Sequence, residues 1–354
     1  MRSKSFSSVA AEFDDSLRSL DAIYEYYLQH QWTDGLPIIP PTEDKVAAML
    51  DYISRDPQEE IGLMPPKYGR LTLEKIAINA VMAGCKPEYM PVVVAAVEGM
   101  LDGSFNLNAV QVTTHSSAPL IVLNGPIRHE IEINCGANCF GQGWRANATI
   151  GRAVRLIMVN VGGASPTNMG DLSTFGTPAK YTYCVGENEE ENPWESLHVE
   201  RGFSKDASTV TVFAAEAPHN AMCRTPSTPE LLLETVVDSI VPKGSHSMIF
   251  TTETMIVISP EPAALLYNSG WTKKDIRGYL FDRARQPVGK LKRGGGWPTP
   301  QWPKWIDITD DSCLVPAAER PEDFIILVAG GPGVHCLVIP PYGMSRSVTR
   351  EIKR

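Results

Sequence analysis

The chain has 354 residues, a formal net charge of -9 at pH 7, 43% hydrophobic residues and 21% charged residues. This length can bury a large core, in one big domain or two of ordinary size, and the composition is that of a globular protein. The acidic balance argues against nucleic acid or an anionic membrane surface as a partner, because phosphates bind a basic face. A small molecule or another protein is the expected partner.

Targeting signals are not recognisable in the sequence. The N-terminal apolar run is too short for a secretory signal, and no window approaches the roughly 18 apolar residues of a membrane span. The seven cysteines are odd in number and scattered along a chain too long to need disulfide bonds. We therefore expect a cytoplasmic protein with reduced thiols.

Helical patterns dominate the N-terminal part of the chain. The helices expected there cover 11–31, 43–53, 73–83 and 91–101. Prolines at 37, 40 and 41 make the segment between the first two helices rigid and extended. Thr72 is a typical N-cap for the third helix, and Gly84 is a typical end.

Strands and helices alternate from residue 109 onward. Apolar runs predict strands over 109–124 with a loop at 113–117, and over 181–185, 209–215, 247–258, 324–329 and 334–339. Helices are expected from Asn147 as N-cap to about 162, from Pro229 to 240, over 260–268, and over 273–285 with Thr272 and Asp275 forming a capping box. The last two strands form a hairpin or a strand-loop-strand unit.

This alternation favours an α/β fold with a layered mixed sheet flanked by helices, and α+β is the alternative. The expected regions are N-terminal helices with a proline-rich segment over 1–70, a main α/β region over 71–285, an exposed arm or lid over 286–305, and C-terminal strands completing the fold over 306–354. The arm is rich in Gly, Pro, Lys and Trp. We expect it to wrap a neighbouring subunit, which predicts a homo-oligomer.

The densest group of ionisable residues follows the strand over 181–185. Carboxylates just past a strand end lie where α/β proteins bind ligands, and crowding drives their pKa values apart, so Glu190 and Glu191 are candidates for proton transfer. A run of glutamates is equally typical of a solvated loop. His198 and Glu200 would share one face of an extended strand, as a general base pair or as metal ligands.

A glycine-rich stretch over 136–147 is a candidate anion cradle. Gly141 and Gly143 allow backbone NH groups to converge, and the helix that follows adds a partial positive charge. Arg145 would grip a carboxylate or phosphate, with Asn147 as the helix cap. The stretch matches neither a Walker A loop nor the dinucleotide fingerprint, and a glycine turn used only for packing is the alternative.

Loop histidines and cysteines complete the candidates. His115 and His219 follow strand-like segments among small polar residues, where an imidazole would face a pocket or solvent. Cys184 is a candidate nucleophile, although its acidic neighbours oppose a thiolate and a strand cysteine is usually a buried hydrophobe. Cys135 and Cys139 lack the spacing of a redox pair and a second pair of zinc ligands. We assign no metal site and recognise no cofactor motif.

Four segments resemble a family of bacterial proteins found with, or fused to, UGSC-type (seleno)cysteine proteins: Trp32–Thr42, Asn79–Tyr89, Arg145–Arg152 and Glu187–Trp194. The resemblance spans nearly the whole chain. Members are often labelled thiol-disulfide oxidoreductases, so the resemblance implies a link to thiol or redox chemistry and a possible UGSC-type partner. The chain contains no UGSC or CGSC tetrapeptide.

The leading functional hypothesis is an enzyme of small-molecule metabolism, a lyase or hydrolase acting on a carboxylate- or acyl-bearing substrate. In it the glycine-rich loop with Arg145 holds the substrate oxygen, while His198, Glu200 and one of Glu190 or Glu191 move protons. The alternatives are a thiol-dependent oxidoreductase or its partner subunit, and a metal-dependent enzyme with His and Glu ligands. Each requires residues distant in the sequence to face one cavity.

Overall fold

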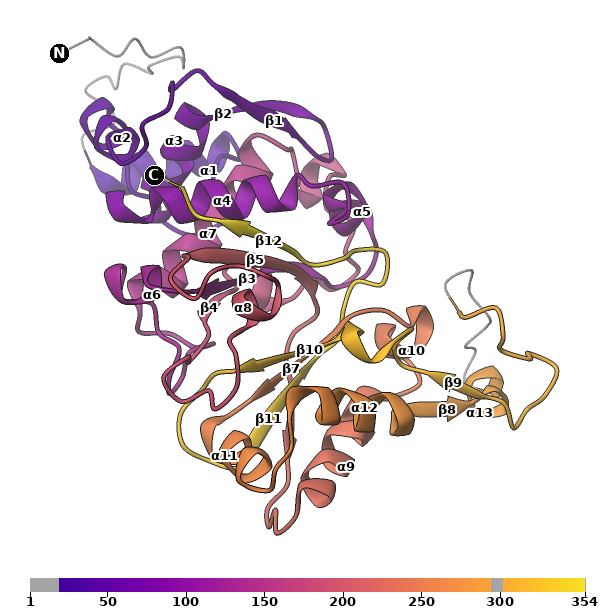
Figure 1. The fold of residues 1–354 in the computed structure, drawn as a ribbon. Helices are drawn as coiled ribbons and strands as arrows, with labels where there is room; N and C mark the ends of the chain where they lie inside the picture. Colours follow the sequence, from indigo (N-terminus) through magenta and orange to yellow (C-terminus); the bar gives the residue numbers. More distant parts are fainter. Residues whose placement is uncertain (1–18, 294–301, 354) are drawn as a thin grey trace.

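The computed structural model of the chain describes residues 19–293 and 302–353, so the beginning of the helix predicted over 11–31 lies outside the described residues. Figure 1 shows two stacked halves, one drawn mainly in indigo and magenta and the other in orange and yellow. Each half contains a mixed sheet with helices on its outer side. The predicted α/β class is confirmed, with two sheets in place of the expected one.

The first sheet has the strand order β12-β5-β3-β4. Strand β3 pairs antiparallel with β5 and parallel with β4, which makes the sheet mixed. Every residue of β3 and β5 is buried, as expected for strands covered on both faces. The strands are β3 (Ala118–Asn124), β4 (Cys184–Gly186), β5 (Thr209–Ala215) and β12 (Val348–Glu351).

The second sheet has the strand order β10-β7-β11-β6. Strand β7 pairs parallel with β10 and antiparallel with β11. Because β7 lies between β10 and β11, the two C-terminal strands form a strand-loop-strand unit and the hairpin alternative is wrong. The strands are β6 (His219–Met222), β7 (Thr254–Ile258), β10 (Phe324–Val328) and β11 (His335–Ile339).

The two sheets pack face to face. In each sheet, successive side chains along a strand point alternately towards the other sheet and towards the helices. Leu120 and Val122 of β3 share an apolar cluster with Val257 of β7, between the sheets. Ile121 of β3 points the other way, into a core with the first group of helices, and Ile256 of β7 points into a core with the second group. The order of layers is therefore helix, sheet, sheet, helix, since successive strand residues face opposite sides.

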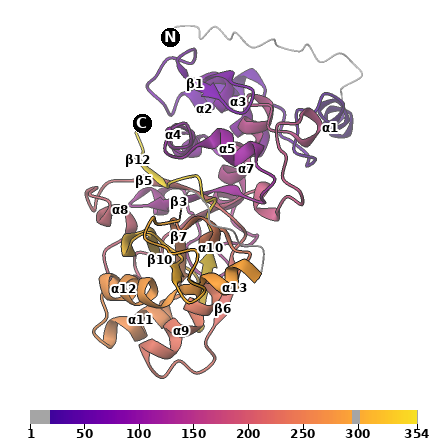
Figure 2. The same cartoon turned by 90° about the vertical axis from the view of Figure 1, so that its right-hand side faces the viewer.

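Helices α3 (Leu73–Ala83), α4 (Met90–Met100) and α7 (Arg145–Asn160) cover the first sheet, and α9 (Pro229–Ile240), α11 (Pro260–Asn268) and α12 (Lys273–Arg283) cover the second. Figure 2 shows the two groups at opposite ends of the molecule. The predicted caps are present: Thr72 accepts a hydrogen bond from the Lys75 backbone, Gly84 is left-handed at φ 90°, and Thr272 forms a capping box with Asp275.

The remaining elements lie around these layers. They are α1 (Leu20–Gln29), α2 (Glu43–Leu50), β1 (Glu60–Met64), β2 (Gly69–Thr72), α5 (Leu107–Val112), α6 (Ile127–Glu130), α8 (Leu197–Glu200), α10 (His246–Phe250), β8 (Arg285–Pro287), α13 (Val288–Arg293) and β9 (Leu314–Pro316). No helix among the described residues is long and apolar enough to cross a membrane.

Several predicted elements are wrong in part; the strand predicted over 181–185, for example, covers only Cys184–Gly186. Residues 107–112 form helix α5, so only the second half of the run over 109–124 is a strand. The predicted strand over 247–258 begins as helix α10 and becomes β7 at Thr254. Helix α7 begins at Arg145 with Trp144 as its N-cap, so Asn147 lies in the first turn and not at the cap. Apolar content alone does not separate a short buried helix from a strand.

The arm predicted over 286–305 is partly buried along the residues that the structure describes; residues 294–301 lie outside them. Val288 and Leu291 are each 1% exposed and join the core of the second half. The Trp302 indole is buried as well and donates a hydrogen bond to the carbonyl of Ile249. Trp305, by contrast, is 58% exposed. Val288, Leu291 and Trp302 therefore pack onto their own chain.

The C-terminal segment joins the two sheets. After β11, Pro341 forms a bridge with Ala215 at the end of β5. The Tyr342 backbone donates to the carbonyl of Ala214, and the Glu216 backbone donates to the carbonyl of Pro340. The chain then returns to the first sheet as β12 (Figure 1). This crossing fixes Glu216 and Tyr342 beside the loop that precedes β3.

Candidate functional site

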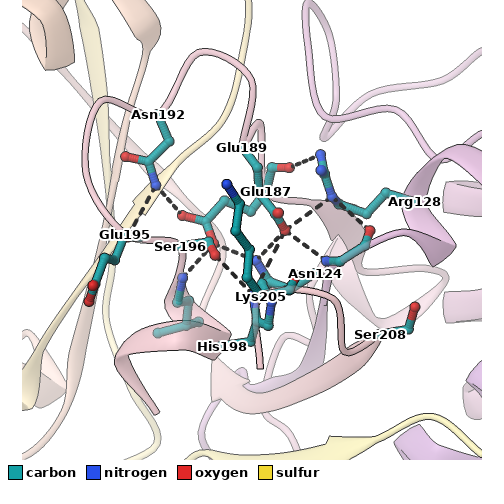
Figure 3. Close-up of polar contacts among 12 residues, drawn as sticks. Asn124, Arg128, Glu187, Glu189, Asn192, Glu195, Ser196, His198, Lys205 and Ser208 are labelled. Carbon is teal, nitrogen blue, oxygen red and sulfur yellow. Dashed lines mark hydrogen bonds and ion pairs between the residues drawn. The ribbon is translucent and has the colours of Figure 1, made fainter. Parts of the chain in front are cut away.

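The acidic segment that follows β4 turns inward at Glu187. This carboxylate is fully buried, and it accepts hydrogen bonds from the Leu197 backbone at 2.8 Å, from Asn192 at 2.8 Å and from Asn124 at 2.5 Å (Figure 3). Burial raises the pKa of the Glu187 carboxyl. Both of its oxygens are occupied by donors of the protein, which anchors the loop to the end of β3.

Arg128 of α6 holds the next two carboxylates. Its guanidinium is 4% exposed, lies 3.1 Å from Glu189 and makes a paired contact with Glu190 at 2.9 and 3.0 Å. It also donates to the carbonyls of Gly125 and Glu187. The guanidinium hydrogen bonds lower the pKa of the Glu190 carboxyl to about 2. Figure 3 shows Arg128 beside Glu187 and Glu189 in this cluster.

Glu187, Glu189 and Glu190 are all held by donors of the protein, which supports a structural role for the segment. The positive partner of the carboxylates is Arg128, which the sequence analysis missed, and not Arg145. Arg128 lies on the short helix α6, directly after Gly125 and Pro126. Nothing in that local sequence indicates that its side chain packs against the end of a strand. Glu191, the remaining candidate acid, is exposed.

His198 and Glu200 do not form the predicted pair. They lie on the helix α8 and not on a strand, so residues two apart point in different directions. His198 is fully buried, with Nδ1 3.0 Å from the Ser196 hydroxyl and Nε2 3.3 Å from the Lys205 carbonyl. Glu200 accepts from Lys273 and Arg277. Both side chains are tied to the framework.

The glycine-rich stretch is not an anion cradle. Gly141 and Gly143 lie at the surface, and Arg145 donates from Nε to the carbonyl of Gly84. The Asn147 side chain is buried and accepts from the Asn134 backbone while donating to carbonyls of the same loop. The packing interpretation of this stretch is therefore the one that the geometry supports.

The thiols are poorly placed for nucleophilic work. Burial raises the pKa of the Cys184 thiol far above its ordinary value, and raises those of Cys85 and Cys336 to about 12. The pKa of Cys139 rises to about 11, and that of Cys135 rises as well, also because of burial. A thiol must ionise to attack, so these environments oppose it.

One predicted residue, His115, does line a pocket. The pocket has a volume of about 440 Å³ and lies where the loop before β3 meets α10 and the C-terminal crossing. Hydroxyl and imidazole groups share its wall with aromatic rings. Its lining residues are Thr113, Thr114, His115, Ser116, Thr174, Phe175, His246, Phe250 and Tyr342.

Two imidazoles are stacked in this pocket. The rings of His115 and His246 lie 3.4 Å apart between centroids and 13° apart in plane, with the Tyr342 ring 6.2 Å from His115. Nε2 of His115 lies 3.2 Å from a carboxylate oxygen of Glu216, a close contact between the two groups that lacks the alignment of a hydrogen bond. His246 was not predicted because it lies just before the strand expected over 247–258. Glu216 was not predicted because nothing in the sequence indicates its partner.

The surroundings of His246 keep its ring uncharged. Burial and the neighbouring His115 lower the pKa of His246 to about 3, so its ring is neutral near pH 7. Two unit charges at the 3.4 Å of this stack would repel by about 5 kcal/mol at an effective dielectric constant of about 20. His115 is the ring of the pair that lies beside a carboxylate.

The remaining histidine candidate lies elsewhere. His219 is on the exposed face of the strand β6, opposite Val338 of β11. Among residues 19–293 and 302–353, no three His, Cys, Asp or Glu side chains lie together in a way that could hold a metal ion. His198 and Glu200, the candidate metal ligands, are thus not joined by His115 or His219.

No known protein-family model matches the chain, and no curated protein matches it. The resemblance to UGSC-associated proteins stays a prediction.

Proposed function

We propose that the protein is an enzyme of small-molecule metabolism, a hydrolase or lyase acting on a carboxylate- or acyl-bearing substrate, with His115 as the general base. The observation that carries the proposal is the His115–His246 stack beside Glu216, in a pocket at the junction of the two sheets. This replaces the earlier assignment of proton transfer to His198 and Glu200, whose polar atoms are already engaged.

Glu216 acts as the orienting group. A carboxylate beside Nε2 favours the proton on that nitrogen, which leaves the lone pair of the His115 ring on Nδ1. In a hydrolase, this nitrogen takes a proton from the attacking water and returns it to the leaving group. In a lyase, it takes a proton next to the carbonyl while the leaving group departs from the adjacent carbon.

Hydroxyl groups suit the pocket for a substrate oxygen. Thr113, Thr114 and Ser116 share the lining with His115, and the Thr174 backbone, also in the lining, donates to the Thr114 carbonyl. The Thr113 hydroxyl oxygen accepts from the His115 backbone, so its own proton is available for a substrate carbonyl. Aromatic rings of Phe250 and Tyr342 offer an apolar wall for the rest of the molecule.

The test is a substrate screen followed by paired variants. Wild-type protein is incubated with a panel of small esters, amides and hydroxy acids, and products are followed by NMR. For any compound that is turned over, His115→Gln should lower kcat by about 10²- to 10⁴-fold, the usual contribution of a general base. His219→Gln, which alters an exposed imidazole outside the pocket, is the matched control and should retain activity.

Glu216→Gln should lower kcat less than His115→Gln does and should shift the pH profile, since it removes the charge behind the ring. Circular dichroism confirms that each variant is folded. A folded His115→Gln protein with the kcat of the wild type would refute the proposal.

A further inference from the structure

The charge distribution of the pocket narrows the class of ligand. The lining contains no lysine and no arginine, and its two imidazoles are stacked on each other. A carboxylate, that of Glu216, lies 3.2 Å from Nε2 of His115. The surroundings of the stack are therefore unfavourable for an anionic ligand.

The cations close to the lining loop are held by the framework and do not belong to the lining. Lys180 donates to both oxygens of Asp171 at 2.6 Å, in the loop that leads to Thr174. Arg155 is buried, lies 3.7 Å from the same aspartate and donates to the Lys180 carbonyl. Arg145, the predicted grip for an anion, contacts Gly84 on another part of the surface. A carboxylate that entered the pocket would lose water and would find no lysine or arginine in the lining.

An uncharged carbonyl meets no such penalty. It needs a donor for its oxygen, and the lining provides hydroxyls on Thr113, Thr114, Ser116 and Thr174. The Ser116 hydroxyl accepts from Ser173 at 3.3 Å and keeps its own proton to donate. Burying a neutral polar group with a hydrogen bond costs far less than burying an unpaired charge.

We infer that this pocket binds an uncharged carbonyl compound, an ester or amide, with the oxygen against the threonine and serine hydroxyls and the apolar part against Phe250 and Tyr342. The inference rests on the proposed function in taking this pocket as the substrate site. Of the two substrate classes considered, carboxylate-bearing and acyl-bearing, the inference retains only the uncharged acyl compounds.

Benzamide and benzoate test the inference, because they have the same shape and differ in charge. Affinities are measured by calorimetry and saturation-transfer NMR at about pH 8, where the acid is ionised. Benzamide should bind the wild type at least about tenfold more tightly than benzoate, a difference of about 1.4 kcal/mol. Glu216→Gln should narrow that ratio, because it removes the charge that repels the anion, while Glu191→Gln, an exposed control, should leave it unchanged.

Thr174→Trp fills the pocket and should abolish binding of benzamide. The inference is overturned if benzoate binds as tightly as benzamide or more tightly, if neither compound binds, or if Thr174→Trp has no effect. These outcomes are separable from those of the kinetic test. A His115→Gln variant with undiminished turnover would refute the base while leaving a measured preference for benzamide intact.

Discussion

Asn147 provides a direct test of the structural interpretation of the glycine-rich stretch. Its side chain is 4% exposed and accepts from the Asn134 backbone at 2.8 Å. The same amide donates to the carbonyls of Asn134 at 2.9 Å, Cys184 at 3.2 Å and Cys139 at 3.3 Å. One buried side chain therefore joins the loop, the helix α7 and the strand β4.

Replacing Asn147 with alanine should destabilise the protein by about 3 to 5 kcal/mol. The Asn134 NH loses its partner inside the protein, and a buried unsatisfied donor costs about 1 to 3 kcal/mol. Loss of each hydrogen bond to a carbonyl adds about 0.5 to 1.5 kcal/mol, and the longer bonds contribute the smaller values. The Asn134 carbonyl keeps a weak hydrogen bond from the Gly186 backbone, which reduces its share.

The assay is urea denaturation followed by tryptophan fluorescence and circular dichroism, which report the midpoint for each variant. Thr149→Ala is the control: it lies on the same helix and loses one hydrogen bond to the Arg145 carbonyl. Its free energy of unfolding should fall by less than about 1 kcal/mol. A stable Asn147→Ala protein that has lost substrate turnover would refute this reasoning and restore Asn147 to the substrate site.

Three further outcomes are expected. Glu190 has a pKa of about 2 in the folded chain against about 4.3 in the unfolded chain, so its stabilising effect is full above about pH 4.3 and is lost towards pH 2. Glu190→Gln should therefore reduce the fall in the free energy of unfolding between these pH values. The effect should be modest because the Glu190 side chain is 52% exposed. Cys184 and Cys85 should resist an aromatic disulfide reagent in native protein and react in urea; rapid native labelling of Cys184, located by mass spectrometry, would revive the thiol hypothesis. Thr272→Ala should lower stability by about 1 kcal/mol through loss of the cap of α12, and unchanged urea midpoints would contradict the role of that cap.

Local signals in the sequence located most of the framework. The buried strands over 209–215 and 324–328 read as apolar runs, and α3 begins after Thr72 and ends at Gly84, as capping chemistry requires. The spacing of apolar and capping residues along the sequence indicates these elements, because the residues that form one helix or strand are neighbours in the chain. The short segments at 107–112 and 246–250 were misassigned because a few apolar residues fit either period.

The candidate site was only partly predictable. His115 was identified from its loop, but its partners come from residue 216, from α10 and from the crossing at residue 342. No spacing in the sequence relates these positions. The carboxylates after β4 were recognised as unusual, yet Arg128, from a different helix, determines that they are bound internally.

The sequence by itself determined an α/β protein with capped helices and buried strands, because those features depend on neighbours within a few residues. Only the tertiary structure decided which ionisable groups are free to act. Charge and hydrogen-bonding capacity are used up by whatever packs against them, so Glu187, His198 and Arg145 became structural, while the meeting of two sheets brought His115, His246 and Glu216 into one pocket.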